Sequence, residues 1–195
     1  AGAALVGGRF GRIRYTIDFE TKSLEGSLVF FFLALGCLAI PTIYLSTLSA
    51  STVLLSATLV AILVTGVEAV SRDGRDNLFV PLAACLILKR ISSKPPFEIL
   101  YQNVSLLLLI AVMAAFAWRS RAFNVGGTLT AILFCYASWS LGSEIWAVPV
   151  FLATVGFIAV RRGAEVELVR TGIAVSALLL PFCILLVANA TDHYA

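Results

Sequence analysis

The chain has 195 residues, of which 60% are hydrophobic and 13% are charged, and its mean hydropathy is +0.99. A water-soluble domain of this size cannot bury so much apolar side chain, so the composition indicates an integral membrane protein. The formal net charge of +3 is small, which argues against nucleic acid as a partner.

Residues 1–26 are mixed in character, and a series of apolar runs follows them. The first two runs cover residues 27–45 and 51–70 and are joined by an uncharged turn rich in Ser and Thr. Each run is long enough to cross ~30 Å of hydrocarbon at ~1.5 Å per helical residue. Pro41 predicts a kink in the first of these helices.

A polar cluster at residues 68–77 ends the second run, and further apolar runs follow it. The third run, residues 78–88, is short, and Pro95 and Pro96 predict a loop over residues 89–103. The later apolar runs are residues 104–118, 128–141, 146–160 and 172–187, and the polar segments between them include residues 119–127 and 161–170. The pattern predicts an all-α, polytopic transmembrane helical bundle with about seven apolar segments. We expect residues 1–100 to form one domain and residues 101–195 to add further transmembrane helices.

The distribution of Lys and Arg predicts which polar segments share a side of the membrane. If all seven runs cross, 11 of these residues lie on one side and 3 on the other; if residues 78–88 do not cross, the division is 9 to 5. Because cytoplasmic loops carry an excess of Lys and Arg, seven crossings are favoured. This arrangement places residues 1–26 and 68–77 on the same, cytoplasmic, face.

A glycine-rich basic segment near the start of the chain is a candidate phosphate site. Gly7, Gly8 and Gly11 surround Arg9, and the segment is expected to form a turn. Glycine lets backbone N–H groups approach a phosphate closely, and Arg can bind it through two hydrogen bonds. The alternative is a basic loop that flanks the membrane and binds anionic lipid.

A second polar block, residues 22–27, opens the first apolar run. Ser23 is a candidate N-cap, and Gly26 would allow close packing. Lys22 is a candidate phosphate ligand, and Glu25 would orient it or share a metal. A capped helix start with a Lys that extends to the membrane surface is an equally good interpretation.

The cluster at residues 68–77 offers carboxylate and amide oxygens at high density. Glu68 ends an apolar helix, while Asp73, Asp76 and Asn77 surround Gly74. Such oxygens are the ligands that Mg²⁺ prefers, and Mg²⁺ accompanies nucleotide phosphates. A turn with Asp or Asn capping the next helix is the alternative, but an acid at the end of a membrane helix favours function.

Three blocks, taken in order, resemble the CTP-dependent polyprenol kinase family, which includes phytol kinase, dolichol kinase and a CTP-dependent diacylglycerol kinase. The blocks are residues 3–11, residues 22–27, and the pattern Glu68, Ser71, Gly74, Asp76, Asn77, Val80 and Pro81. The resemblance covers about residues 1–90 and is strongest for phytol kinase-like members. It implies transfer of the CTP γ-phosphate to a lipid alcohol, with a divalent metal, at the cytoplasmic face.

The resemblance also implies roles for individual residues. Those implied to bind the nucleotide are Gly7, Arg9, Gly11, Lys22, Ser23, Glu25 and Gly26. Glu68, Asp76 and Asn77 are implied to be catalytic, with Glu68 and Asp76 as ligands of the metal, for which we expect Mg²⁺. The family has an acidic residue just before the first block and further spans before that, so we expect this chain to be a C-terminal part of the kinase.

Two other functions stay open. The CTP:phosphatidate cytidylyltransferases share the first two blocks, but their Pro-Gly-His-Gly-Gly block is absent from this chain. A non-catalytic transport or scaffold module would more often show polar breaks in several helices near the middle of the membrane. The later apolar runs here carry almost no charge, which disfavours transport.

Overall fold

A computed structural model describes residues 2–17, 20–71, 74–120, 125–141, 148–153 and 156. Its elements are, in order, α1 (Gly2–Phe10), β1 (Arg14–Ile17), β2 (Glu20–Ser23), α2 (Leu24–Leu45), α3 (Ala50–Val70), α4 (Asp76–Ile91), α5 (Pro96–Ser120) and α6 (Val125–Leu141). The expected polar segment at 161–170 and the apolar run at 172–187 lie outside the described residues, as does most of the run at 146–160.

Three of these helices are long and apolar enough to cross a membrane, namely Leu24–Leu45, Ala50–Val70 and Pro96–Arg119, and Val125–Ser140 is a shorter apolar helix. The helical membrane architecture predicted from the sequence is therefore confirmed in this coarse form. The number of seven crossings stays a prediction. Helix α4 has 16 residues and does not reach the length of a full span.

The helix starts follow local capping chemistry. Ser23 has an extended backbone and its hydroxyl accepts a hydrogen bond from the N–H of Gly26, which confirms it as the N-cap of α2. Ser49 caps α3 in the same way through the N–H of Thr52. Pro96 begins α5, where the N–H that proline lacks is not needed. The loop between α4 and α5 therefore covers only residues 92–95, and not residues 89–103 as predicted.

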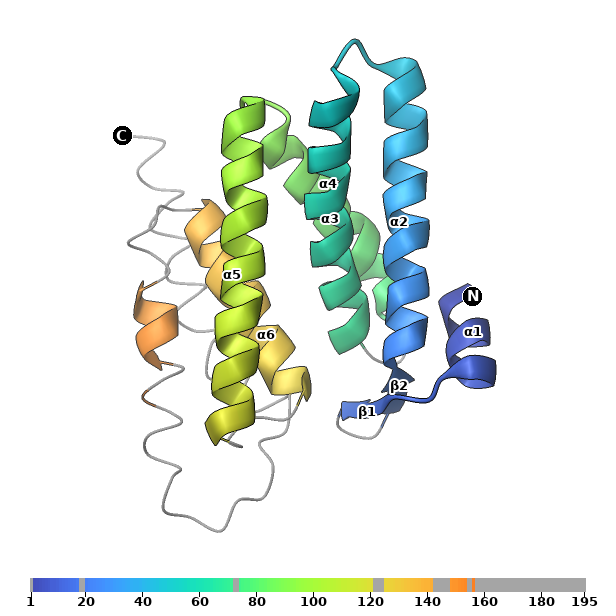
Figure 1. Cartoon of the computed structure of the whole chain (residues 1–195), viewed down its shortest axis with the longest axis vertical. Coiled ribbons are helices and arrows are strands. Elements are labelled where there is room, and N and C mark those ends of the chain that lie inside the picture. Colours follow the sequence, from blue (N-terminus) through green and yellow to red (C-terminus); the bar gives the residue numbers. More distant parts are fainter. Residues whose placement is uncertain are drawn as a thin grey trace. The chain divides into compact units, whose positions relative to one another are not determined.

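The chain forms two compact units, residues 1–108 and 109–195. In the first unit α3 packs against both α2 and α4, and α1 packs against α2 (Figure 1). Of the apolar window of α3, 44% is buried, against 6% for α2. Helix α3 is thus the interior helix of this unit, and α2 presents an apolar face that lipid would cover.

Helix α5 is joined to α3 by a buried amide. The side-chain N–H group of Asn103 donates to the backbone oxygen of Leu55 at 3.1 Å and to that of Ile99 at 2.9 Å. Both bonds lie within the first unit. In the second unit, α6 buries Ala131, Cys135 and Tyr136 along its length.

One sequence-based expectation for residues 1–26 is wrong. Gly7 and Gly8 lie within helix α1 rather than in a turn, and among the described residues positive φ is found at Gly74 instead. The polar stretch after α1 forms a short antiparallel hairpin, β1 with β2, which was not predicted from the sequence and which is added to an otherwise helical set of described elements. Each strand has only four residues, and Ile17 at the end of β1 is the one large aliphatic residue in them, so the hydrophobic pattern is too short to predict a hairpin. Packing of β2 against α2 accompanies the pairing.

Candidate functional site

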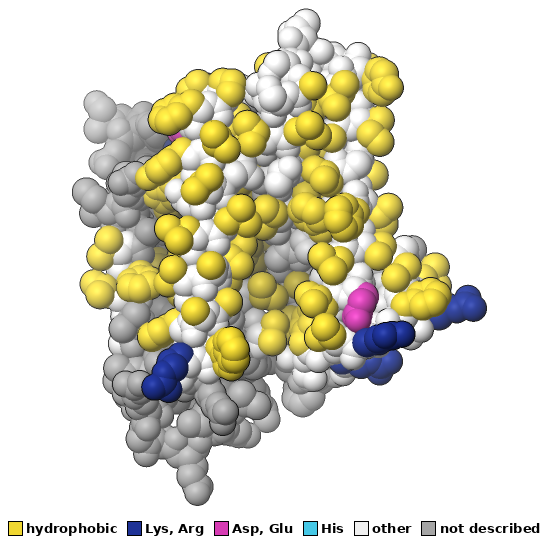
Figure 2. Space-filling model, viewed as in Figure 1, with side chains coloured by type: hydrophobic (Ala, Val, Ile, Leu, Met, Phe, Trp, Pro, Cys, Tyr) yellow, Lys and Arg dark blue, Asp and Glu magenta, His cyan; other side chains and the backbone are white. Residues whose placement is uncertain are grey.

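A polar pocket of about 370 Å³ opens where α1, the hairpin, the start of α2 and the end of α3 meet. Its lining consists of Ala3, Ala4, Gly7, Gly8, Arg14, Glu20, Thr21, Lys22, Ser23, Gly26, Ser27 and Glu68. Lys and Arg side chains gather at this end of the unit, around α1 and the hairpin, whereas the visible faces of α2 and α3 are mostly apolar (Figure 2). The pocket therefore lies at an end of the apolar helices, where a membrane protein meets water.

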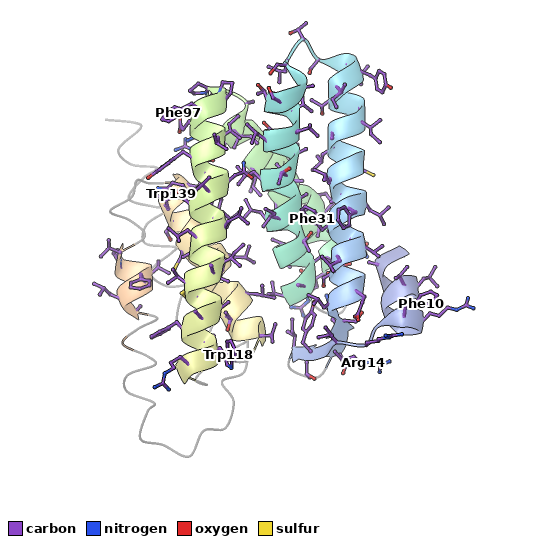
Figure 3. All side chains as sticks on the ribbon, in the orientation of Figure 1. Phe10, Arg14, Phe31, Phe97, Trp118 and Trp139 are labelled. Carbon is purple, nitrogen blue, oxygen red and sulfur yellow. The ribbon has the colours of Figure 1, made fainter. Side chains whose placement is uncertain are left out.

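The hairpin carries most of the charged lining. Its register pairs Arg14 with Ser23 and Tyr15 with Lys22. The backbone N–H of Leu24 donates to the oxygen of Ile13 at 2.9 Å, which ties the residue just before β1 to the start of α2. Figure 3 shows Arg14 at the hairpin, beyond the first turn of α2. Because β2 runs directly into α2, Lys22 and Ser23 take fixed positions at the end of a rigid helix.

Close contact between α1 and α2 forms another wall of the pocket, and it requires glycine. A Cβ atom at Gly7 would lie 2.6 Å from the Ser23 hydroxyl oxygen, and one at Gly26 would lie 3.0 Å from the backbone oxygen of Ala3. A Cβ at Gly11 would lie 2.2 Å from the backbone oxygen of Gly7. These glycines bring two backbones together, whereas a Cβ at Gly8 would meet nothing within 4 Å.

Lys22 and Glu68 form an ion pair across the pocket, although 46 residues separate them. The Lys22 Nζ atom lies 3.1 Å from Glu68 Oε1 and also donates to the backbone oxygen of Glu68. The two side chains are 19% and 17% exposed, so solvent screens the pair only in part. The pair links the hairpin to the last turn of α3.

Glu25 supports the segment between α1 and the hairpin. Its Oε1 atom accepts hydrogen bonds from the backbone N–H groups of Arg12 at 2.9 Å and Ile13 at 3.1 Å. Its Oε2 atom is buried and has no hydrogen-bond partner among the described residues. Glu25 does not line the pocket, so the geometry gives it a supporting position.

Tyr15 contacts a residue of the pocket wall but does not line the pocket itself. Its hydroxyl lies 2.7 Å from the Ser27 hydroxyl, and Ser27 lines the pocket while Tyr15 does not. Burial raises the pKa of the Tyr15 hydroxyl; the Ser27 hydrogen bond opposes that increase and the Glu68 carboxylate adds to it. Tyr15 is therefore protonated at neutral pH and has a proton to donate.

Half of the predicted site residues meet in this pocket. Those that line it are Gly7, Lys22, Ser23, Gly26 and Glu68. Those that do not are Arg9, Gly11, Glu25, Asp76 and Asn77. Arg9 is exposed and lies over the Phe10 ring, and Asp76 begins α4, one residue before Asn77. Asp73 lies outside the described residues.

Several lining residues were not among the predicted site residues. The polar ones are Arg14, Glu20, Thr21 and Ser27. Their sequence signal is weak because short polar stretches before a membrane helix usually form a solvated loop. The hairpin register, which is a tertiary feature, is what brings them to the pocket.

The pocket has the donors and acceptors that a nucleotide phosphate with a divalent cation needs, but no complete metal cage. Lys22 and Arg14 supply positive charge, while Glu20 and Glu68 supply carboxylates. Among the described residues no three His, Cys, Asp or Glu side chains converge. Mg²⁺ usually takes only one or two carboxylates and completes its shell with phosphate oxygens and water, so the donor set fits that ion.

A phytol kinase from Synechocystis sp. (strain ATCC 27184 / PCC 6803 / Kazusa) is 44% identical to this chain over 87 residues. The match covers 44% of this chain and 36% of that protein, so the chain spans little more than a third of its relative's length. No family model matches the chain, and no solved structure does. The similarity supports the resemblance to phytol and polyprenol kinases but does not select a member.

Proposed function

We propose that this protein is an integral-membrane kinase that transfers the γ-phosphate of CTP to a lipid alcohol of the phytol, polyprenol or diacylglycerol type. The observation that carries the proposal is the position of the Lys22–Glu68 pair, in a polar pocket at the end of two apolar helices. A kinase for a lipid substrate needs such a place, because the phosphate donor is dissolved in water and the acceptor in the membrane. The similarity to a phytol kinase over 87 residues supports the same conclusion.

Lys22 and Arg14 are the proposed phosphate ligands. Both line the pocket, and both come from the hairpin that leads into α2. The pocket volume of about 370 Å³ falls within the ~300–1,000 Å³ typical of small-molecule sites. A triphosphate in the pocket would compete with Glu68 for the Lys22 ammonium group, so binding would release the Glu68 carboxylate.

The released Glu68 carboxylate is the proposed proton acceptor. In the reaction, the oxygen of the alcohol forms a bond to the γ-phosphorus, and the bond from that phosphorus to the β–γ bridging oxygen breaks. CDP leaves with the bridging oxygen, and the proton of the alcohol passes to Glu68 and then to water. A group positioned for such a transfer typically contributes ~10²–10⁴-fold to the rate.

A divalent cation is part of the proposal. It would neutralise charge on the β- and γ-phosphates. Asp76 and one oxygen of Glu68 are its proposed protein ligands, so the second Glu68 oxygen is the proton acceptor. Of these two residues, Glu68 lines the pocket. Asp76 starts α4 after a turn that follows α3, so a role for it requires this turn to lie against the bound nucleotide.

We further propose that the pocket faces the cytoplasm. The 11-to-3 division of Lys and Arg between the two sides supports this orientation. The long apolar chain of the alcohol would then remain in the hydrocarbon layer beside α2, and its hydroxyl would reach the pocket at the interface.

The test is to incubate membranes that contain the protein with γ-labelled CTP, Mg²⁺ and phytol, a polyprenol or diacylglycerol. We expect labelled lipid monophosphate and CDP, with less product from ATP. Label recovered in pyrophosphate, together with a CDP-lipid, would instead establish a cytidylyltransferase. Absence of label transfer to any of these lipids would refute the proposed kinase.

Lys22→Met provides the matched variant, with Lys89→Met as its control. Both remove one Lys charge, but Lys89 is exposed in the last turn of α4 and does not line the pocket. We expect Lys22→Met to reduce turnover by about 10²-fold, the scale for losing one positioned donor to a reacting group. Lys89→Met should leave turnover unchanged.

A further inference from the structure

Ser27 lines the pocket and lies within α2 beside its exposed apolar residues. It lies in the first turns of the helix, three residues after Leu24 and one before Leu28, whose side chains are 44% and 49% exposed. Residues three and four apart share a helix face, so Leu24 and Leu28 form an apolar strip beside Ser27. A polar wall of the pocket thus borders an apolar surface at Ser27.

The Ser27 hydroxyl is held by Tyr15 and keeps hydrogen-bonding capacity for the pocket. The two hydroxyl oxygens are 2.7 Å apart, and either group can be the donor. A serine hydroxyl has one proton and two lone pairs. When Tyr15 donates in this pair, the Ser27 proton is free to be donated to a lone pair of another hydroxyl. The proton of that second hydroxyl then stays available to Glu68.

Tyr15 is well placed to fix Ser27 because its own position is fixed. It lies in β1, opposite Lys22 in the hairpin register, and its side chain is half-buried. Holding a side chain in one orientation before the substrate arrives reduces the entropy lost on binding. A Ser hydroxyl without this partner would rotate among its staggered positions.

We propose that Ser27 binds the hydroxyl of the lipid alcohol acceptor and that Tyr15 is a positioning residue that orients Ser27 for this contact. The inference rests on the proposed kinase function and adds the acceptor subsite to it. The alkyl chain of the acceptor would follow Leu24 and Leu28 into the membrane. Its hydroxyl would then stand between Ser27 and the phosphate ligands Lys22 and Arg14, which line the same pocket.

The test compares Ser27→Ala, Ser27→Thr, Tyr15→Phe and the double variant in membranes, with KM measured separately for the alcohol and for CTP. We expect Ser27→Ala to raise KM for the alcohol or lower kcat so that kcat/KM for the alcohol falls about tenfold, because a polar contact to the substrate is lost. KM for CTP should stay within about twofold. Ser27→Thr, which retains the hydroxyl, should restore most of the loss.

Tyr15→Phe should lower kcat/KM for the alcohol by about threefold in the wild-type background and have no further effect when Ser27 is already Ala, since coupled residues are not additive. Tyr44→Phe is the control, because Tyr44 is exposed at the other end of α2. Additive losses, or a change in KM for CTP alone, would overturn the inference while leaving the kinase proposal intact. A wild-type protein that phosphorylates no lipid alcohol would overturn both.

Discussion

Replacement of Glu68 by Gln should have opposite effects on nucleotide binding and on turnover. In the structure the Lys22 ammonium group is engaged by Glu68 through both the carboxylate and the backbone oxygen. A phosphate that binds Lys22 must displace the carboxylate. The Glu68→Gln substitution would keep the shape of the side chain but remove its charge, so CTP would displace a weaker partner.

The size of the effect follows from the geometry of the pair. Hydrogen bonds to charged groups contribute about 1.5–3 kcal/mol, and the 3.1 Å contact with its two partly buried side chains belongs to that class. A neutral amide retains roughly half of that energy, which leaves about 0.75–1.5 kcal/mol for the nucleotide and corresponds to about four- to twelvefold tighter binding. Turnover should fall by about 10²-fold or more, because the proposed proton acceptor is gone.

The assay is equilibrium binding of labelled CTP to the protein in membranes, in the presence of a chelator. The chelator removes divalent cations, so the loss of Glu68 as a metal ligand cannot weaken CTP binding and hide the gain in affinity at Lys22. Glu20→Gln is the matched control, because Glu20 lines the same pocket and its replacement leaves the Lys22–Glu68 pair in place. Its effect on affinity should stay below about threefold. Weaker binding by Glu68→Gln, or equal gains in both variants, would refute the exchange of partners at Lys22.

Three further predictions concern packing and arrangement. Gly7→Ala should lower the free energy of unfolding of the detergent-solubilised protein by about 1–3 kcal/mol, because the new Cβ would lie 2.6 Å from the Ser23 hydroxyl oxygen. Gly8→Ala should leave that free energy unchanged, because a Cβ there would meet nothing within 4 Å. Asn103→Ala should cost about 0.6–2 kcal/mol in the same unfolding measurement, because it removes the bond between α5 and the backbone of α3; an unchanged midpoint would contradict this role. Cysteines introduced at Arg9 and Asp76 should be labelled from the same side of the membrane, and labelling from opposite sides would exclude a single site that includes both.

Local sequence was sufficient to predict two of the membrane helices and one of their caps. The apolar runs expected at residues 27–45 and 51–70 correspond to α2 and α3 within a few residues. Apolar length and the absence of charge are properties of a single segment, and a Ser side chain caps a helix through bonds to its own neighbours, so neither depends on distant parts of the chain. The same local logic failed at Gly7 and Gly8, which lie in a helix, and at Gly7 glycine serves contact with another helix rather than a turn.

The pocket itself was decided by tertiary structure. Lys22 and Glu68 are polar residues beside apolar runs, and the sequence predicted both as site residues. Their pairing across 46 residues depends on how α3 packs against α2. The hairpin that adds Arg14 and Glu20, and the bond between Tyr15 and Ser27, arise from strand register. Strands of four residues are too short for their sequence to fix a register, which depends on burial of Ile17 and on packing against the neighbouring helices. The sequence by itself therefore determined that this is a membrane protein with polar groups at the ends of its helices, and the packing of those helices determined which of the groups meet.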